Sequence, residues 1–380
     1  MMSNTLPYLT LMLLLLWLYA NERQSIRLLS PRAAGWSAFV LIFLFIGLRG
    51  HLYSDFINYF PFYEQLPTIT RLNSSAMMSY LFEPGFVIYS SIIKSLGADY
   101  FAWVAIGSLL DLAVFRLTFR RYTGSVILPF IFFIAYNGLT IEFNLYRNAK
   151  AMDLFLLSLP YLERRRAMPY IMLNILGATF HLSSLIYLPL YLLLHRNLGS
   201  RIRWGGIVFA NILFLGNIGI VAELMESLDI FRAMAFYDKL SAHAEHSTAH
   251  YGLTFGHIER TFAIVLFTWL YEPMTRQRAS NTIFYNALWL YYVTFLIFHE
   301  VEVFVDRIPT LFAFGYWILY SNLASLRWRW RQIILLVAIL LAMVKTGIAN
   351  RSIATRYENV IFGISDYHTR QHEIAPLLKD

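Results

Sequence analysis

The chain of 380 residues contains no cysteine, so neither a disulfide framework nor thiolate chemistry is available to it. Charged residues are also scarce. Asp, Glu, Lys and Arg make up 14% of the sequence, whereas about 25% is usual in a soluble domain. Hydrophobic residues make up 58% and aromatic residues 17%, a level that suits aromatic belts at the two bilayer interfaces. We therefore expect most of the chain to lie in a membrane.

The net charge of +8 does not indicate a nucleic-acid partner, because the basic residues form short clusters between apolar runs and do not line a phosphate groove. By the positive-inside rule these clusters belong in the cytoplasm, so both termini and the intervening loops are predicted to face outward. The six clusters are Arg23, Arg27 and Arg32; Arg116, Arg120 and Arg121; Arg164, Arg165 and Arg166; Arg196, Arg201 and Arg203; Arg276 and Arg278; and Arg327, Arg329 and Arg331.

The apolar runs predict an all-α polytopic membrane protein with about twelve transmembrane helices, since a span needs about 17–25 mostly apolar residues. The run at 83–97 is shorter and carries Glu83, Pro84 and Lys94. An even number of crossings must separate the first two basic clusters, so we predict that 83–97 is a re-entrant or interfacial helix on the outer side. The predicted spans are 5–20, 34–49, 100–118, 125–139, 144–160, 167–180, 182–195, 204–221, 258–271, 281–298, 308–324 and 331–346.

We expect a single integral membrane domain over residues 1–380, with no soluble domain and no internal repeat. The first run is interpreted as a retained span, because no Lys or Arg precedes it and no small-residue cleavage site follows it. Two short spans are predicted to turn near His181. The outward parts are the loops at about 50–82, 138–144, 222–257 and 299–307, and the tail at 347–380.

Two polar groups lie close to the outer ends of early spans, where an ionisable side chain is costly and therefore a candidate for function. Arg49 ends a span, with Asp55 and Tyr59 soon after it. Arg49 either binds phosphate or carboxylate beside a proton-accepting Asp55, or lies at the interface and simply pairs with Asp55. Glu83 opens the short outer helix before Pro84, as a helix cap or as a base or sugar-hydroxyl acceptor.

A third group enters a span from outside. It begins at Asn144 and carries Arg147, Lys150 and Asp153 on adjacent turns of one helical face. Three charges so close together are hard to place against lipid, so we predict that they point into a polar cavity. His181, at the predicted outer turn, is either a satisfied core residue or a base.

Two later segments have weaker signals. Glu300 and Glu302 alternate in a way that suits a cation or a solvated loop, and Arg307, where the next span begins, is a phosphate-binding candidate. The outer loop also contains four histidines and a glutamate at a spacing that could suit zinc, but no surrounding pattern resembles a known metal motif, and we predict no metal site. These residues are His243, Glu245, His246, His250 and His257.

In their order along residues 34–195, these segments resemble the EpsG family of exopolysaccharide polymerases, relatives of the Wzy O-antigen polymerases. The family's motifs are an Arg near the end of an early span with nearby Asp and Tyr, a Glu-Pro helix start, Asn-x-x-Arg-Gln-x-x-Ala, and Phe-His-x-Ser-Ala. Two departures are Asn148 in place of the Gln, whose role is therefore not carried over, and Lys150 before the usual small position. The corresponding segments are Arg49 with Asp55 and Tyr59, Glu83-Pro84, Asn144-Leu145-Tyr146-Arg147-Asn148-Ala149-Lys150-Ala151, and Phe180-His181-Leu182-Ser183-Ser184.

The resemblance implies a GT-C-like bundle and a glycosyltransferase activity. The growing glycan would move from undecaprenyl diphosphate to the non-reducing-end sugar of another undecaprenyl-diphosphate-linked repeat unit, on the periplasmic face of the bacterial cytoplasmic (inner) membrane. We expect no cofactor and no metal, because no Asp-x-Asp pair occurs in the outer loops near the early spans. Expected partners are the lipid-linked oligosaccharide, membrane lipids, a chain-length regulator and a flippase. The implied diphosphate or glycan ligands are Arg49, Tyr59, Asn144, Arg147, Lys150 and Arg307, and the candidate bases, in order, are Asp55, Glu83 and His181.

Three other functions compete with this one. A transporter or flippase for the same lipids would also need outward arginines, although inverted repeats and discontinuous helices, its usual signs, are not evident in the sequence. An O-antigen ligase would use the same donor and leaving group. An integral acyltransferase would use His181 as its base, but no second His or Asp stands at a matching position.

Overall fold

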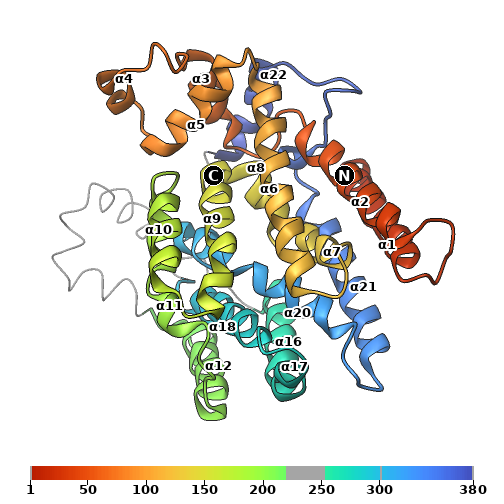
Figure 1. Ribbon diagram of the computed structural model, residues 1–380. Coiled ribbons are helices and arrows are strands. Elements are labelled where there is room, and N and C mark those ends of the chain that lie inside the picture. Colours follow the sequence, from red (N-terminus) through yellow and green to blue (C-terminus); the bar gives the residue numbers. More distant parts are fainter. Residues whose placement is uncertain (1, 220–252, 300–301, 379–380) are drawn as a thin grey trace. The chain divides into compact units, whose positions relative to one another are not determined.

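The computed structural model describes residues 2–219, 253–299 and 302–378, and within these ranges it contains helices and no β-strand (Figure 1). The predicted all-α class is confirmed. By its internal contacts the chain divides into unit 1, Met1–Tyr191 with Tyr320–Asp380, and unit 2, Leu192–Leu319. The single membrane domain proposed from the sequence stays a prediction.

Unit 1 contains most of the helices. They are α1 (Met2–Glu22), α2 (Pro31–Gly47), α3 (Phe56–Gln65), α4 (Ser74–Ser79), α5 (Pro84–Ser95), α6 (Tyr100–Tyr122), α7 (Leu128–Ala135), α8 (Gly138–Asn144), α9 (Tyr146–Glu163), α10 (Ala167–Ala178), α21 (Arg331–Ala349) and α22 (Tyr367–Ile374), with the 3₁₀ turns η1 (Leu182–Tyr187), η3 (Ile353–Thr355) and η4 (Ala375–Leu378). In unit 2 the described helices are α12 (Ser200–Leu215), α16 (Phe255–Trp269), α17 (Tyr271–Gln277), α18 (Asn281–Ile297), α19 (Glu302–Arg307) and η2 (Pro309–Phe312); α11 (Leu190–Leu193) and α20 (Phe314–Leu323) cross the unit boundary.

Two helices in the described part are long and apolar enough to cross a membrane by themselves, α6 and α21. The apolar helices α2 and α10 are shorter. The segment predicted as a span at 182–195 contains a further short apolar helix, Leu182–Leu193, which is built from the 3₁₀ turn η1 and the four-residue α11. The predicted turn near His181 is confirmed. The count of twelve crossings stays a prediction.

The predicted run at 125–139 is a broken helix. α7 ends at Ala135, Asn137 adopts a left-handed φ of 63°, and α8 begins at Gly138. A Cβ on Gly138 would come within 2.4 Å of the Phe133 carbonyl oxygen, so this close approach requires glycine. The segment 138–144, expected to be an outward loop, is therefore a short and largely buried helix.

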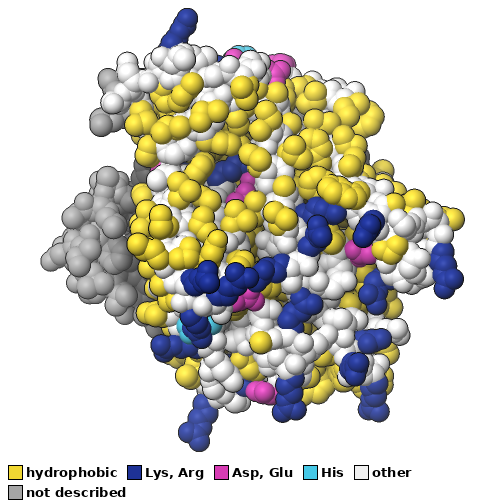
Figure 2. All heavy atoms as spheres, in the orientation of Figure 1, with side chains coloured by type: hydrophobic (Ala, Val, Ile, Leu, Met, Phe, Trp, Pro, Cys, Tyr) yellow, Lys and Arg dark blue, Asp and Glu magenta, His cyan; other side chains and the backbone are white. Residues whose placement is uncertain are grey.

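The basic clusters of unit 1 share one end of it, which we call the arginine end. Arg121 pairs with Glu163 at 2.9 Å, joining the last turns of α6 and α9. The Glu22 carboxylate at the end of α1 accepts a 2.8 Å hydrogen bond from the Val126 amide. The positive-inside rule predicts this gathering. Figure 2 shows Lys and Arg collected in groups on a face otherwise rich in hydrophobic side chains.

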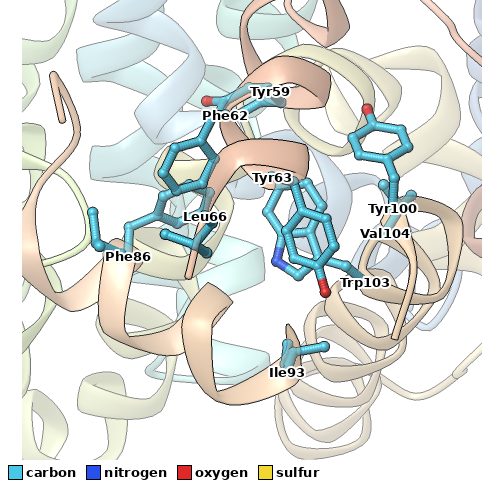
Figure 3. Packing of buried hydrophobic residues seen from close by; sticks show 10 residues of the cluster. Tyr59, Phe62, Tyr63, Leu66, Phe86, Ile93, Tyr100, Trp103 and Val104 are labelled. Atoms are coloured by element: carbon cyan, nitrogen blue, oxygen red, sulfur yellow. The ribbon is translucent and has the colours of Figure 1, made fainter. Parts of the chain in front are cut away.

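At the opposite end, called the site end, α3, α4, α5 and α22 lie beside the ends of α6 and α9 (Figure 1). The predicted short helix at 83–97 corresponds to α5. Aromatic side chains bind α3 to α5 and α6, with Tyr63 stacked on Trp103 at 4.8 Å between ring centroids and Tyr59, Phe62 and Phe86 around them (Figure 3). Each aromatic pair contributes about 0.5–1.5 kcal/mol beyond area burial, so α3 is held firmly over the site.

Candidate functional site

An ion pair between Arg147 and Glu83 lies at the centre of the site end. Arg147 occupies the first turn of α9, and its Nη1 donates to Glu83 Oε2 at 2.5 Å. The other carboxylate oxygen of Glu83 accepts from the Leu182 amide at 3.2 Å, so Glu83 also ties α5 to the turn after α10. The pair is partly open, with 19% of the Arg147 side chain and 14% of the Glu83 side chain exposed.

Glu83 is the residue before α5, but its side chain makes no capping hydrogen bond. Glu83 thus occupies the N-cap position before Pro84, as one interpretation of the sequence has it, but its carboxylate is not used to cap the helix. The negative charge instead orients Arg147, whose guanidinium also lies over the Phe82 ring at 4.6 Å. An arginine held in this way keeps a fixed geometry for binding an anion.

Tyr59 connects this pair to Arg49. Its hydroxyl accepts from Arg147 Nε at 3.5 Å, and its ring stacks on Tyr146 at 4.4 Å with an angle of 4°. On Tyr146 lies the Arg49 guanidinium, 5.0 Å from the ring centroid. Burial raises the pKa of Tyr59, so its hydroxyl stays protonated and can donate to a ligand.

Arg49 is buried, with only 3% of the residue exposed. Its Nη1 donates to the Ile46 carbonyl at 2.6 Å and to Ser108 Oγ at 2.8 Å, and its Nη2 donates to the Glu142 carbonyl. Arg49 thus joins α2, α6 and α8. An interfacial arginine that extends to water, the simpler of the two sequence interpretations, does not describe this environment.

Asn144, the last residue of α8, holds the loop that contains Asp55. Its Oδ1 accepts from the amides of Ser54 and Asp55, at 3.2 and 2.9 Å, and from the Ser54 hydroxyl at 3.2 Å. Asp55 itself is half-buried at the start of α3, and its side chain does not cap that helix. The amide oxygen of Asn144 is therefore used within the protein.

His181 lies at the turn between α10 and η1, as predicted. Its Nδ1 accepts from the Ser183 amide at 3.1 Å, which assigns the proton of the neutral ring to Nε2. The Ser183 hydroxyl lies 2.8 Å from Nδ1 and donates to Asn148 Oδ1 at 3.2 Å. In this tautomer Nδ1 is the acceptor used within the protein and Nε2 carries the proton, and the role of His181 as a base stays a prediction.

Lys150 points away from Arg147 into a second, buried group of charges. Its ammonium donates to Asp111 at 2.5 Å and to the Gly107 carbonyl at 2.7 Å. Asp153 and Glu142 are also buried here, and one oxygen of each carboxylate has no hydrogen-bond partner. The cavity that Arg49, Lys150, Asp111 and Glu142 line is about 20 Å³, room for one water molecule and far too small for a sugar.

The family model for the EpsG family matches residues 34–361, which include all of unit 2 and most of unit 1. The chain belongs to the EpsG family. This is a family of membrane proteins and of Wzy-type polysaccharide polymerases. No curated protein and no solved structure matches the chain significantly.

For this EpsG-family chain, one region of unit 1 brings together seven of the residues singled out in the sequence, namely Arg49, Asp55, Tyr59, Glu83, Asn144, Arg147 and His181. Lys150 lies beneath them in the buried group. Arg307 is exposed at the end of α19 in unit 2 and stays a prediction. His243, Glu245, His246, His250 and Glu300 lie outside the described residues.

Two carboxylates of the buried group were not predicted from the sequence. Asp111 stands in the middle of the apolar run at 100–118, and an acidic residue at that position is itself a signal. Glu142 was assigned to an outward loop, so its burial was not expected. The site of this EpsG-family protein thus has two layers, a buried group around Lys150 and a partly open group around Arg147.

Proposed function

We propose that the protein polymerises lipid-linked oligosaccharide repeat units. The growing glycan would be transferred from undecaprenyl diphosphate to a hydroxyl of the non-reducing-end sugar of a second carrier-linked unit, at the outer face of the cytoplasmic membrane. The observation that carries this proposal is the partly open Arg147–Glu83 pair, a cation held in fixed geometry at the site end of an EpsG-family protein. A lipid diphosphate leaving group needs such a cation.

In the proposed reaction the acceptor hydroxyl oxygen bonds to the anomeric carbon while the bond from that carbon to the diphosphate oxygen breaks. The electron pair of the broken bond leaves with undecaprenyl diphosphate, whose developing charge Arg147 stabilises. Asp55 takes the hydroxyl proton, and the Tyr59 hydroxyl donates to a glycan oxygen. Glu83 orients Arg147, and Arg49 and Lys150 add a fixed positive field from beneath.

The test is polymerisation by the purified protein in lipid vesicles with defined diphosphate-lipid repeat units. We expect a ladder of products from the wild type, including in the presence of EDTA, and none from the Arg147→Ala variant. The matched control is Arg164→Ala, which removes an exposed arginine from the arginine end and should leave the ladder intact. A normal ladder from Arg147→Ala would refute the assignment.

The same preparation separates the alternatives. A ligase would give a single transfer without a ladder, and a flippase would move the lipid-linked glycan between leaflets without joining two units. The α7–α8 break is a discontinuous helix of the kind found in transporters, so leaflet exchange should be measured with the same substrates.

A further inference from the structure

The C-terminal segment, residues 350–378, packs against the loop that leads from Arg49 into α3. Three backbone hydrogen bonds join the two: Gly50 N–H to the Glu358 carbonyl at 2.9 Å, Val360 N–H to the Leu48 carbonyl at 2.8 Å, and Tyr53 N–H to the Ala354 carbonyl at 2.8 Å. These contacts lie at the site end, on either side of an antiparallel bridge between Arg49 and Asn359. The tail therefore supports the backbone that carries Arg49.

Arg370 on α22 fixes this arrangement. It is fully buried, with 0% of the residue exposed. Its Nε donates to the His51 carbonyl at 2.9 Å, and its Nη2 donates to the Ile353 carbonyl at 2.9 Å, so one guanidinium holds the loop and the tail together. Its Nη1 pairs with Glu373 at 2.8 Å. A lysine, with a single compact ammonium, cannot reach these separate acceptors.

Further charges brace the tail around Arg370. Arg356 pairs with Glu358 at 2.8 Å and with Glu373 at 2.9 Å. Glu358 also accepts from the amide and the hydroxyl of Ser365, at 2.9 and 2.7 Å. This network of contacts holds residues 353–373 together as one unit, and this unit packs against the loop.

The loop that the tail supports continues into the proposed site, where it carries Asp55 and leads to Tyr59. Asp55 is held by Asn144, and Tyr59, on the helix that follows, contacts Arg147. Tyr367 of the tail donates to the Ile57 carbonyl at 3.1 Å, between these two residues. The loop with Asp55 and Tyr59 is thus held between Asn144 on one side and the tail on the other.

We propose that the C-terminal segment is a positioning element of the active site, with Arg370 as its central positioning residue. The inference rests on the proposed function and deepens it, because it assigns a role to residues beyond 361, where the family match ends. Arg370 is fully buried and does not touch substrate. It acts by holding Asp55 and Tyr59 at their distances from Arg147.

The first test compares Arg370→Gln with Arg351→Gln, which changes an exposed arginine of the same tail. Because a misplacement of 1 Å can cost about 10²-fold in rate, we expect Arg370→Gln to slow polymerisation by about 10²-fold and Arg351→Gln to match the wild type. In hydrogen exchange, the Gly50 and Tyr53 amides should exchange faster in Arg370→Gln, with α6 and α9 unchanged.

The second test is a covalent rescue, which a chain without cysteine makes clean. An ideal Cβ on Gly50 would lie 3.0 Å from the Glu358 Cβ and 2.9 Å from Ile364 Cγ2, so the Ile364 side chain must move aside and the two backbones must separate by about 0.5 Å to reach the Cβ spacing of a disulfide. Adding Gly50→Cys and Glu358→Cys to Arg370→Gln should restore the ladder after oxidation and lose it again on reduction. The same cysteine pair without Arg370→Gln is the control.

Three outcomes overturn the inference: a normal ladder from Arg370→Gln, loss of the ladder with Gly50 and Tyr53 as protected as in the wild type, or no rescue although mass spectrometry shows the disulfide. A wild type that makes no ladder refutes the proposed function instead. In that case the exchange measurement still decides whether Arg370 holds the loop.

Discussion

The Arg147–Glu83 pair predicts that removing either charge destabilises the protein similarly but changes donor binding in opposite directions. Both side chains are partly buried, at 19% and 14% exposure. Exposed pairs contribute about 0.2–1 kcal/mol, and breaking a buried pair costs about 3–5 kcal/mol. For Arg147→Gln and for Glu83→Gln we therefore expect a loss of about 1–3 kcal/mol in unfolding free energy.

Donor binding separates the two variants. A glutamine at position 83 keeps one acceptor oxygen, so it can accept from Arg147 or from the Leu182 amide but not from both as Glu83 does, and it no longer competes for the guanidinium with a negative charge. We expect the KM for the lipid-diphosphate donor to fall by about tenfold in Glu83→Gln, which corresponds to about 1.4 kcal/mol. Arg147→Gln removes the cation at the leaving group, so it should raise the donor KM and lower kcat by about 10²–10³-fold.

The assay is initial-rate polymerisation in vesicles over a range of donor concentrations, with unfolding of the same preparations followed in detergent. Similar increases in donor KM for both variants would refute the reasoning, because the pair would then act only as a structural link between α5 and α9. Loss of kcat in Glu83→Gln would also contradict it, because the reaction would then need the negative charge of Glu83 itself.

Four further results are expected. Arg49→Lys should lower the unfolding free energy by about 1.5–3 kcal/mol in denaturant titration, since one ammonium cannot replace a fork with three acceptors. Asn144→Ala should increase amide exchange at residues 54–55 and cost about 1–3 kcal/mol. Lys150→Met should cost about 3–5 kcal/mol in the same titration, because the buried carboxylates of Asp111 and Asp153 lose their cation. Burial opposes ionisation of Glu358, but hydrogen bonds from its neighbours lower its pKa. The stabilisation by ionised Glu358 is therefore complete above the unfolded pKa of about 4.3 and is lost as the pH falls through the lower folded pKa. Amide exchange in the loop should accordingly rise below about pH 4.

Much of the site was predictable because each signal is local. Arg49, Glu83 and Arg147 all lie where an apolar run begins or ends, and the ends of antiparallel helices meet at the same level. Their gathering at the site end follows from the order of spans and basic clusters alone. The pairing of Glu83 with Arg147 does not follow from it, because Glu83 had an equally good local role as the cap of α5.

Other parts depend on contacts that no local pattern encodes. Arg370 bonds mainly to backbone carbonyls, including that of His51, which lies 319 residues away in the sequence. Any residue supplies a carbonyl, so the partners leave no trace in the sequence. The break between α7 and α8, in contrast, has a signal in the sequence, since Asn137-Gly138 is a recognised turn dipeptide. The hydrophobicity around it outweighed that signal.

The two layers of charge place different demands on the fold. Lys150 and Asp111 are buried around a cavity the size of one water molecule, so the distance between them must be fixed. A substrate that replaced one of them as a partner would leave the other buried charge without its counter-ion. Arg147 and Glu83 remain partly hydrated, so an incoming diphosphate can replace the carboxylate as the partner of Arg147 at little cost. A protein that binds and releases a polyanion in every cycle needs a partly hydrated pair where the anion binds and a buried pair beneath it. Helix α9 provides both, with Arg147 and Lys150 one turn apart.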